Sequence, residues 1–139
     1  MNKTAVPHTD QKPTILIVED DESARKFLSR IFVHLDFPFV AVESGEQAVN
    51  FAATTHFDIA FVDMVLNGMN GVKTLKTLKT IIPEIKAVVF TGFSEQQMIE
   101  EAMNIGADAV LDKPFSLTEI FGIMSRMLAD KKKTNHDVK

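Results

Sequence analysis

The sequence predicts an α/β domain in which a doubly wound, five-stranded parallel sheet lies between two layers of helices, a three-layer α/β/α architecture. Three observations predict it. Short apolar runs recur along the chain, segments with helical spacing separate them, and capping motifs mark the start of several of those segments. Strands that alternate with helices over short connections form parallel sheets with right-handed crossovers. The expected order is therefore a (βα)5 repeat.

Five runs rich in Val, Ile and Phe are expected to form the strands. A strand with one solvent-exposed face typically has a polar residue at every second position, and none of the five runs has this pattern. Uninterrupted apolar runs instead favour a parallel sheet that helices cover on both faces. In chain order the runs are Thr14–Val18, Phe39–Val42, Ile59–Val62, Ala87–Phe90 and Ala107–Leu111.

The segments after the first and fifth runs carry apolar residues spaced along one face of a helix. We expect both stripes to face the core and not a cofactor. The first consists of Phe27, Leu28, Ile31, Phe32 and Leu35, and the last of Leu117, Ile120, Phe121, Met124 and Leu128.

Three helix starts fit the capping box, in which a hydroxyl and a side chain three residues later each accept a hydrogen bond from the other residue's backbone N–H. The fourth helix is expected over Glu95–Ile105. The capping pairs are Ser44 with Gln47, Ser94 with Gln97, and Ser116 with Glu119.

The composition excludes several classes of function. The 139 residues suit one domain, which can bury a core without disulfides or a structural metal, and the absence of cysteine excludes zinc–cysteine sites, iron–sulfur clusters and thiol nucleophiles. A net charge of −4 argues against direct nucleic-acid binding. No apolar stretch approaches the roughly 20 residues of a membrane helix, so we expect a soluble, cytoplasmic protein with no membrane insertion.

The two ends of the chain differ from its middle. Residues 1–13 and 130–139 are polar and lack apolar anchors, so both are expected to be flexible tails. The folded domain is expected over residues 14–129, and no linker or repeat divides it.

Polar residues follow four of the predicted strands, where ligands of open parallel sheets bind. Four acids, Glu19–Glu22, follow the first run, Asp63 ends the third, Thr91 follows the fourth and Lys113 the fifth. Each has an ordinary explanation by itself, since acids favour the first turn of a helix and Asp is common in turns. Together they would bring acids, a hydroxyl and an ammonium to one rim, and the acids would attract a hard cation such as Mg²⁺.

At these residues the sequence resembles the receiver domain of two-component response regulators, in particular the stand-alone, chemotaxis-regulator-like receivers. The resemblance extends from Thr14 to about Leu128 and implies a flavodoxin-like fold. The matching motifs are Ile15 to Glu22, Phe57 to Asp63 with Gly71 eight residues later, Val89 to Gly92, and Lys113 to Phe115.

The resemblance implies a role for each acid. Asp63 would be the phosphoacceptor, whose carboxylate attacks a histidine-bound phosphoryl group and forms an acyl phosphate. Asp20 and Asp63 would bind Mg²⁺ directly, Glu19 through water, and Val65 through its backbone carbonyl. Asp21 would be a helix-start neighbour and not a ligand.

The resemblance also implies the remaining contacts and the partners. Lys113 and the hydroxyl of Thr91 would bind phosphoryl oxygens, and the Lys113–Pro114 bond would be cis. The phosphodonor would be a sensor histidine kinase or a histidine phosphotransfer protein. The downstream protein would read the face made by the fourth helix, the fifth strand and the fifth helix. The chain would be a stand-alone signalling phosphoacceptor in a phosphorelay and not an enzyme, apart from its self-phosphorylation and self-dephosphorylation.

The sequence departs from the family at four positions. Val65 and Phe93 are apolar where the family tunes the access of hydrolytic water, which predicts slow self-dephosphorylation. Val110 replaces the usual Tyr or Phe three residues before Lys113, so the conformational relay is expected to be altered or weak. Asn67 replaces a common proline and leaves its loop less restrained.

Three alternatives compete with this interpretation. The first is a receiver-like interaction module that is never phosphorylated. The second is a Mg²⁺-dependent phosphatase with an aspartyl-phosphate intermediate, but the first loop lacks the hydroxyl-bearing context of that motif. The third is a flavodoxin, whose cofactor phosphate the acidic first loop would repel.

Overall fold

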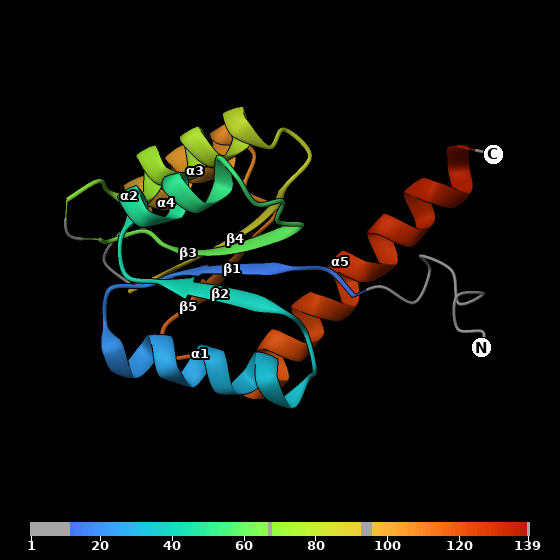
Figure 1. Ribbon diagram of the computed structural model, residues 1–139, viewed down its shortest axis with the longest axis horizontal. Helices are drawn as coiled ribbons and strands as arrows, with labels where there is room; N and C mark the ends of the chain where they lie inside the picture. The colour runs from blue at the N-terminus through green and yellow to red at the C-terminus, as the bar shows by residue number, and fades with distance from the viewer. Residues whose placement is uncertain (1–11, 67, 93–95, 139) are drawn as a thin grey trace.

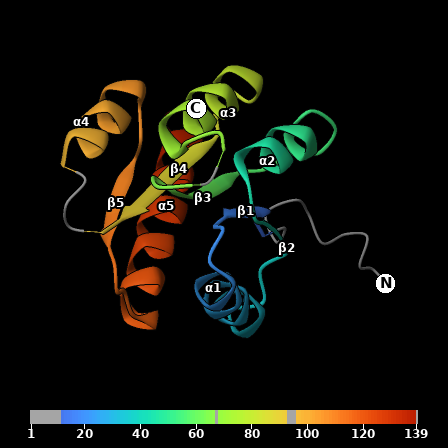
Figure 2. The ribbon, with the colours of Figure 1, turned by 90° about the vertical axis from the view of Figure 1, so that its left-hand side faces the viewer.

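The computed structural model describes residues 12–66, 68–92 and 96–138, and it confirms the predicted fold. Five parallel strands form one sheet in the order β2-β1-β3-β4-β5 (Figures 1 and 2). The register pairs Val18 with Val62, and Asp63 with Phe90. The strands are β1 (Ile15–Val18), β2 (Phe39–Val42), β3 (Ile59–Asp63), β4 (Lys86–Thr91) and β5 (Ala109–Asp112).

The helices divide between the two faces of the sheet, as right-handed crossovers require. Figure 1 shows helices covering both faces. On one face lie α1 (Glu22–His34) and α5 (Leu117–Val138), and on the other lie α2 (Gly45–Ala52), α3 (Gly71–Ile81) and α4 (Gln96–Ile105).

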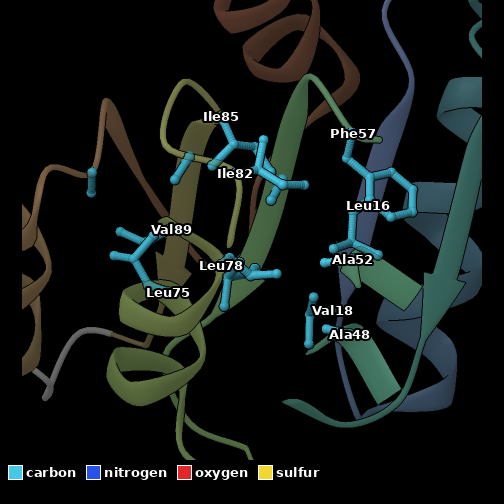
Figure 3. Packing of buried hydrophobic residues seen from close by; sticks show 14 of the residues in the cluster. Leu16, Val18, Ala48, Ala52, Phe57, Leu75, Leu78, Ile82, Ile85 and Val89 are labelled. Carbon is cyan, nitrogen blue, oxygen red and sulfur yellow. The ribbon is translucent and has the colours of Figure 1, made fainter. Parts of the chain in front are cut away.

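Each face of the sheet has its own hydrophobic core. Leu16 and Val18 of β1 point to the side of α2 and α3, where Leu75 and Leu78 pack (Figure 3). Ile15 and Ile17 belong to the core on the side of α1 and α5. All four residues of β1 are completely buried, which is why the strand shows no alternation of apolar and polar residues.

The buried face of α5 differs from the predicted stripe. Ile120 and Met124 are buried as expected, but Leu117 and Phe121 are 44% and 56% exposed. The stripe of Ile120, Ile123, Met124 and Met127 contacts the sheet instead. Both stripes satisfy the helical period, and packing on the sheet selects between them.

The last helix, α5, continues to Val138 through most of residues 130–139, which were predicted as a tail (Figure 1). The boundary of the folded domain near residue 129 stays a prediction. Backbone hydrogen bonds propagate along a helix until a breaker intervenes, and no Gly or Pro lies between Ile123 and Val138. The predicted N-terminal tail falls outside the described residues, except for Lys12 and Pro13, which have no regular structure.

The predicted capping boxes have three different outcomes. Ser116 and Glu119 exchange both hydrogen bonds, at 2.9 and 3.2 Å. Ser44 accepts from the backbone N–H of Gln47, whose side chain accepts from Glu43 instead of Ser44. The pair of Ser94 and Gln97 cannot be assessed, because Ser94 lies outside the described residues.

Among the residues that the structure describes, no helix has both the length and the apolar character needed to span a membrane.

Candidate functional site

The ends of four strands build the candidate site at one edge of the sheet. Because neighbouring strands are parallel and in register, the residues that follow them converge there. Glu19 follows β1, Asp63 is the last residue of β3, Thr91 is the last of β4, and Lys113 follows β5. The chain thus reaches this edge four times with a functional side chain.

Asp63 lies at the centre of the site and is 3% exposed. Its Oδ2 accepts a hydrogen bond from Lys113 Nζ at 2.9 Å, and its Oδ1 accepts from the backbone N–H of Val65 at 3.0 Å. Both oxygens of the carboxylate are therefore fixed in orientation.

Three carboxylates gather around one point. Glu19, Asp20 and Asp63 each offer an oxygen, and these oxygens lie within 4.8 Å of one another. Such crowding of negative charge is unfavourable without a cation, and carboxylate oxygens are the ligands that Mg²⁺ prefers. The sequence predicted all three of these residues as metal ligands, and the structure brings them together.

Glu19 is completely buried within this cluster. Its Oε2 accepts from the backbone N–H of Asp21 at 2.9 Å, while its Oε1 is buried and accepts no hydrogen bond from any described residue. Lys113 Nζ lies 2.9 Å from this Oε1 as an ion pair without hydrogen-bond geometry. Burial raises the pKa of Glu19 to about 7, and the charge of Asp63 adds to this rise. Three carboxylate oxygens this close together suit a hard cation in addition to the single ammonium of Lys113, so the site fits Mg²⁺.

Lys113 lies between two of the carboxylates. Burial alone would lower the pKa of Lys113, but its interactions with Glu19 and Asp63 outweigh burial and raise it above 10.5. The ammonium is therefore charged at neutral pH. The bond between Lys113 and Pro114 is cis, as the resemblance implied.

Thr91 is completely buried at the end of β4, one residue after Phe90, the partner of Asp63 in the sheet register. Its hydroxyl donates to the carbonyl of Gly92 at 3.1 Å. The structure therefore brings Thr91 to the same rim as Asp63.

Two further residues make hydrogen bonds that shape the first loop. Asp21 caps α1 by accepting from the backbone N–H of Ala24 at 2.8 Å, as expected for a residue at the start of the helix. Arg25 donates to the backbone carbonyl of Glu19 at 3.0 Å and to that of Asp20 at 3.4 Å. The sequence prediction missed Arg25. The sequence could have indicated this role, because Arg25 lies in the first turn of the helix that follows the four acids.

Gly71 begins α3 directly against the end of β3. A Cβ at this position would lie 2.3 Å from the backbone oxygen of Asp63 and 2.5 Å from Cα of Met64. The neighbouring Asn70 caps the helix by accepting from the backbone N–H of Lys73 at 2.8 Å. Glycine is therefore required for α3 to pack this closely beside the site.

Two of the four departures from the family lie among the described residues. Val65 is 49% exposed, and Val110 is half-buried against the core on the side of α2 and α3. Asn67 and Phe93 lie outside the described residues. The carbonyl of Val65 as a metal ligand stays a prediction.

Comparison with known proteins gives a consistent result. The model of the response regulator receiver domain matches residues 15–125. The chain is 31% identical over 114 residues to sporulation initiation phosphotransferase F of Bacillus subtilis (strain 168), covering 82% of this chain and 92% of that protein. It is also 31% identical over 104 residues to a cyclic di-GMP phosphodiesterase of Thermotoga maritima, covering 75% of this chain but 28% of that protein.

Among solved structures, a response regulator receiver domain protein (CheY-like) from Methanospirillum hungatei JF-1 superimposes with a TM-score of 0.85 at 22% identity. The match covers 89% of this chain and 99% of that one. At this identity the similarity shows the fold alone, and it is the flavodoxin-like fold that the sequence predicted.

Proposed function

The chain belongs to the response regulator receiver domain family of two-component signalling, and from that premise we propose that Asp63 accepts a phosphoryl group from a phosphohistidine. The observation that carries the proposal is the setting of the Asp63 carboxylate. It lies 2.9 Å from the ammonium of Lys113 and within the cluster formed with Glu19 and Asp20. A carboxylate oriented beside a cationic group and a candidate metal site has the components that phosphoryl transfer requires.

The proposed step is an in-line displacement at phosphorus. An oxygen of Asp63 forms the new P–O bond while the P–N bond to the donor imidazole breaks. The electron pair of that bond stays on the imidazole nitrogen, which then takes up a proton from solvent. The product is an acyl phosphate on Asp63, which carries close to two negative charges at neutral pH, about one more than the carboxylate that it replaces.

Lys113 and Thr91 are proposed to bind the transferred group. The ammonium of Lys113 already contacts Asp63 Oδ2, so a phosphoryl group attached to this carboxylate lies within reach of it. Thr91 offers a hydroxyl from the end of β4, and its turn toward a phosphoryl oxygen would move the segment that leads to α4. These contacts would link the covalent change to a change of surface.

Glu19, Asp20, Asp63 and the backbone carbonyl of Val65 are the residues proposed to hold Mg²⁺, with Glu19 acting through a water molecule. Bound there, the cation would offset negative charge on the phosphoryl oxygens during the transfer. The crowding of the three carboxylates supports this placement, because their oxygens lie within 4.8 Å of one another and a hard cation offsets the repulsion between them.

The proposed partners are proteins. The phosphodonor is a sensor histidine kinase or a histidine phosphotransfer protein, which places the chain in the cytoplasm, where ATP phosphorylates such kinases. The groove beside Lys113, lined by Phe27, Pro114 and Phe115, would give the donor an apolar surface next to Asp63. The downstream target is a protein that reads the face of α4, β5 and α5, and no step requires direct contact with nucleic acid.

The test is the intact mass of the protein after incubation with Mg²⁺ and acetyl phosphate. We expect one phosphoryl adduct on the wild-type chain and none on Asp63→Asn. Asp58→Asn is the matched control, because Asp58 precedes the same strand at the opposite edge of the sheet and accepts from the backbone N–H of Thr14. This variant should still be phosphorylated. The absence of an adduct on the wild-type chain would leave an unphosphorylated interaction module, and rapid release of free phosphate would favour a phosphatase.

A further inference from the structure

We propose that Phe90 is a positioning residue for Lys113 and that its ring holds the ammonium at the place where the phosphoryl group arrives. This inference rests on the proposed function of Asp63. It concerns a residue that makes no contact of its own with the transferred group. The observation behind it is that the Lys113 Nζ lies 5.3 Å from the centroid of the Phe90 ring.

The distance is typical of a cation–π interaction, in which the negative face of an aromatic ring attracts an ammonium within about 6 Å. The same Nζ lies 2.9 Å from Glu19 Oε1 and 2.9 Å from Asp63 Oδ2. The ammonium is thus attracted by two carboxylates and one ring. When phosphorylation changes the charge on Asp63, the attractions of Glu19 and of the ring are left, and the ring is the one that carries no charge of its own.

The ring of Phe90 is itself held firmly. Phe90 is completely buried in β4, and its carbonyl accepts from the backbone N–H of Met64 at 2.9 Å. The ring of Phe115 packs edge-on against it, with centroids 5.4 Å apart at 68°, and Phe27 packs against Phe115 at 6.1 Å. Because its neighbours hold the Phe90 ring in place, the ring can restrain the more flexible side chain of Lys113.

Lys113 needs such a restraint because a lysine side chain is flexible and carries a compact charge. Its side chain is 31% exposed, so solvent competes with the site for the ammonium. A small misplacement of a charged group at a reacting centre slows the reaction strongly. An aliphatic residue at position 90 would fill the space and leave the ammonium less restrained.

A series of fluorinated phenylalanines at position 90 tests the proposal. The variants carry 4-fluoro-, 3,5-difluoro- or 3,4,5-trifluorophenylalanine, which weaken the negative face of the ring stepwise and change its size little. The readout is the rate of phosphorylation by saturating acetyl phosphate with Mg²⁺ at fixed pH. We expect a stepwise decrease that reaches about threefold to tenfold in the trifluoro variant. The Mg²⁺ affinity, measured by calorimetry, should not change.

The matched control is the same series at Phe61. This residue is also completely buried, lies in the same core beside Phe32, and has no cation over its ring among the described side chains. A second control repeats the Phe90 series in the Lys113→Met variant. This variant has no ammonium over the ring, so fluorination can no longer weaken a cation–π interaction there. We expect flat rates in both controls.

The outcomes separate this inference from the proposed function. A flat Phe90 series on a wild-type protein that is phosphorylated normally would overturn the positioning role alone. Equal decreases at Phe90 and Phe61, or an unchanged decrease in Lys113→Met, would also overturn it, because the effect would then be one of packing. The absence of any adduct on the wild-type protein would remove the function of Asp63, and the role of Phe90 with it.

Discussion

Lys113 and the two carboxylates beside it show how single residues define the chemistry of the site. The ammonium lies 2.9 Å from both Glu19 and Asp63, and it is the one cationic side chain that contacts either of them among the described ion pairs. It balances charge before a phosphoryl group arrives and would bind that group afterwards. Its loss is therefore expected to affect the reaction more than the fold.

Lys113→Met should slow phosphorylation by acetyl phosphate by about tenfold to a hundredfold. An ion pair at about 4 Å with an effective dielectric constant near 20 is worth about 4 kcal/mol before desolvation, and only part of it acts in the transition state. The control is Lys86→Met, because Lys86 pairs with Asp108 at 4.0 Å at the other edge of the sheet. Equal rates for Lys113→Met and wild type would contradict the role of Lys113.

Val65 is the residue that we expect to slow loss of the phosphoryl group. Its exposed apolar side chain cannot orient a water molecule toward the acyl phosphate. Val65→Asn should therefore shorten the half-life of the phosphorylated protein by about tenfold, which corresponds to about 1.4 kcal/mol in the barrier. The half-life is measured by intact mass after removal of the phosphodonor. Val33→Asn, at an exposed valine of α1, is the control, and a longer half-life for Val65→Asn than for wild type would refute the prediction.

The start of α3 shows how the placement of an element supports the site. Gly71 lets the helix approach the backbone of Asp63 and Met64 to within a distance that no side chain tolerates. Because the close neighbours are backbone atoms, a substitution cannot be relieved by a change of rotamer. Any shift of α3 would move the end of β3, where Asp63 lies.

Gly71→Ala should lower the free energy of unfolding by about 2 to 4 kcal/mol, because the new Cβ overpacks a buried contact. Denaturant unfolding measures the loss, and phosphorylation should slow as well. Gly122→Ala is the matched control, since a Cβ at this exposed position of α5 meets nothing within 4 Å. There alanine should stabilise the helix by about 0.5 to 1 kcal/mol. An unchanged stability of Gly71→Ala would show that the helix can shift at no cost.

At the scale of the whole molecule, the buried carboxylate of Glu19 links folding to pH. Its pKa is raised from 4.5 to about 7 in the folded chain, mainly by burial. Between these pH values the folded chain binds a proton that the unfolded chain releases, so stability falls as the pH rises. The pKa of Lys113 is raised above 10.5, so its titration lies outside this window.

Without Mg²⁺, the free energy of unfolding should therefore decrease by up to about 3 kcal/mol between pH 4.5 and pH 7. Glu19→Gln should remove most of this slope. Added Mg²⁺ should also flatten it, because the cation favours the ionised carboxylate, and it should raise stability by about 2.7 kcal/mol at a hundredfold excess over its Kd. Urea unfolding at several pH values, with and without Mg²⁺, measures all three. If the free energy of unfolding of the wild-type chain without Mg²⁺ rose between pH 4.5 and pH 7, the raised pKa of Glu19 would be contradicted.

The sequence by itself determined the order of strands and helices and most of the site. Parallel strands that are buried on both faces need uninterrupted apolar residues, so the sequence alone could predict β1, β3 and β4. Ligands of an open sheet gather at the strand ends, so Asp63, Thr91 and Lys113 could be grouped before their positions were known.

Tertiary structure alone decided the features that depend on what a residue packs against. The helical period allowed two faces of α5, and contact with the sheet selected the one with Met127. Gly71 is required because α3 approaches a strand end, and Phe90 lies beneath Lys113 because β4 and β5 are neighbours. A one-dimensional pattern records the polarity and spacing of residues but not their partners from distant segments, and it is those partners that set burial, pKa and close contact.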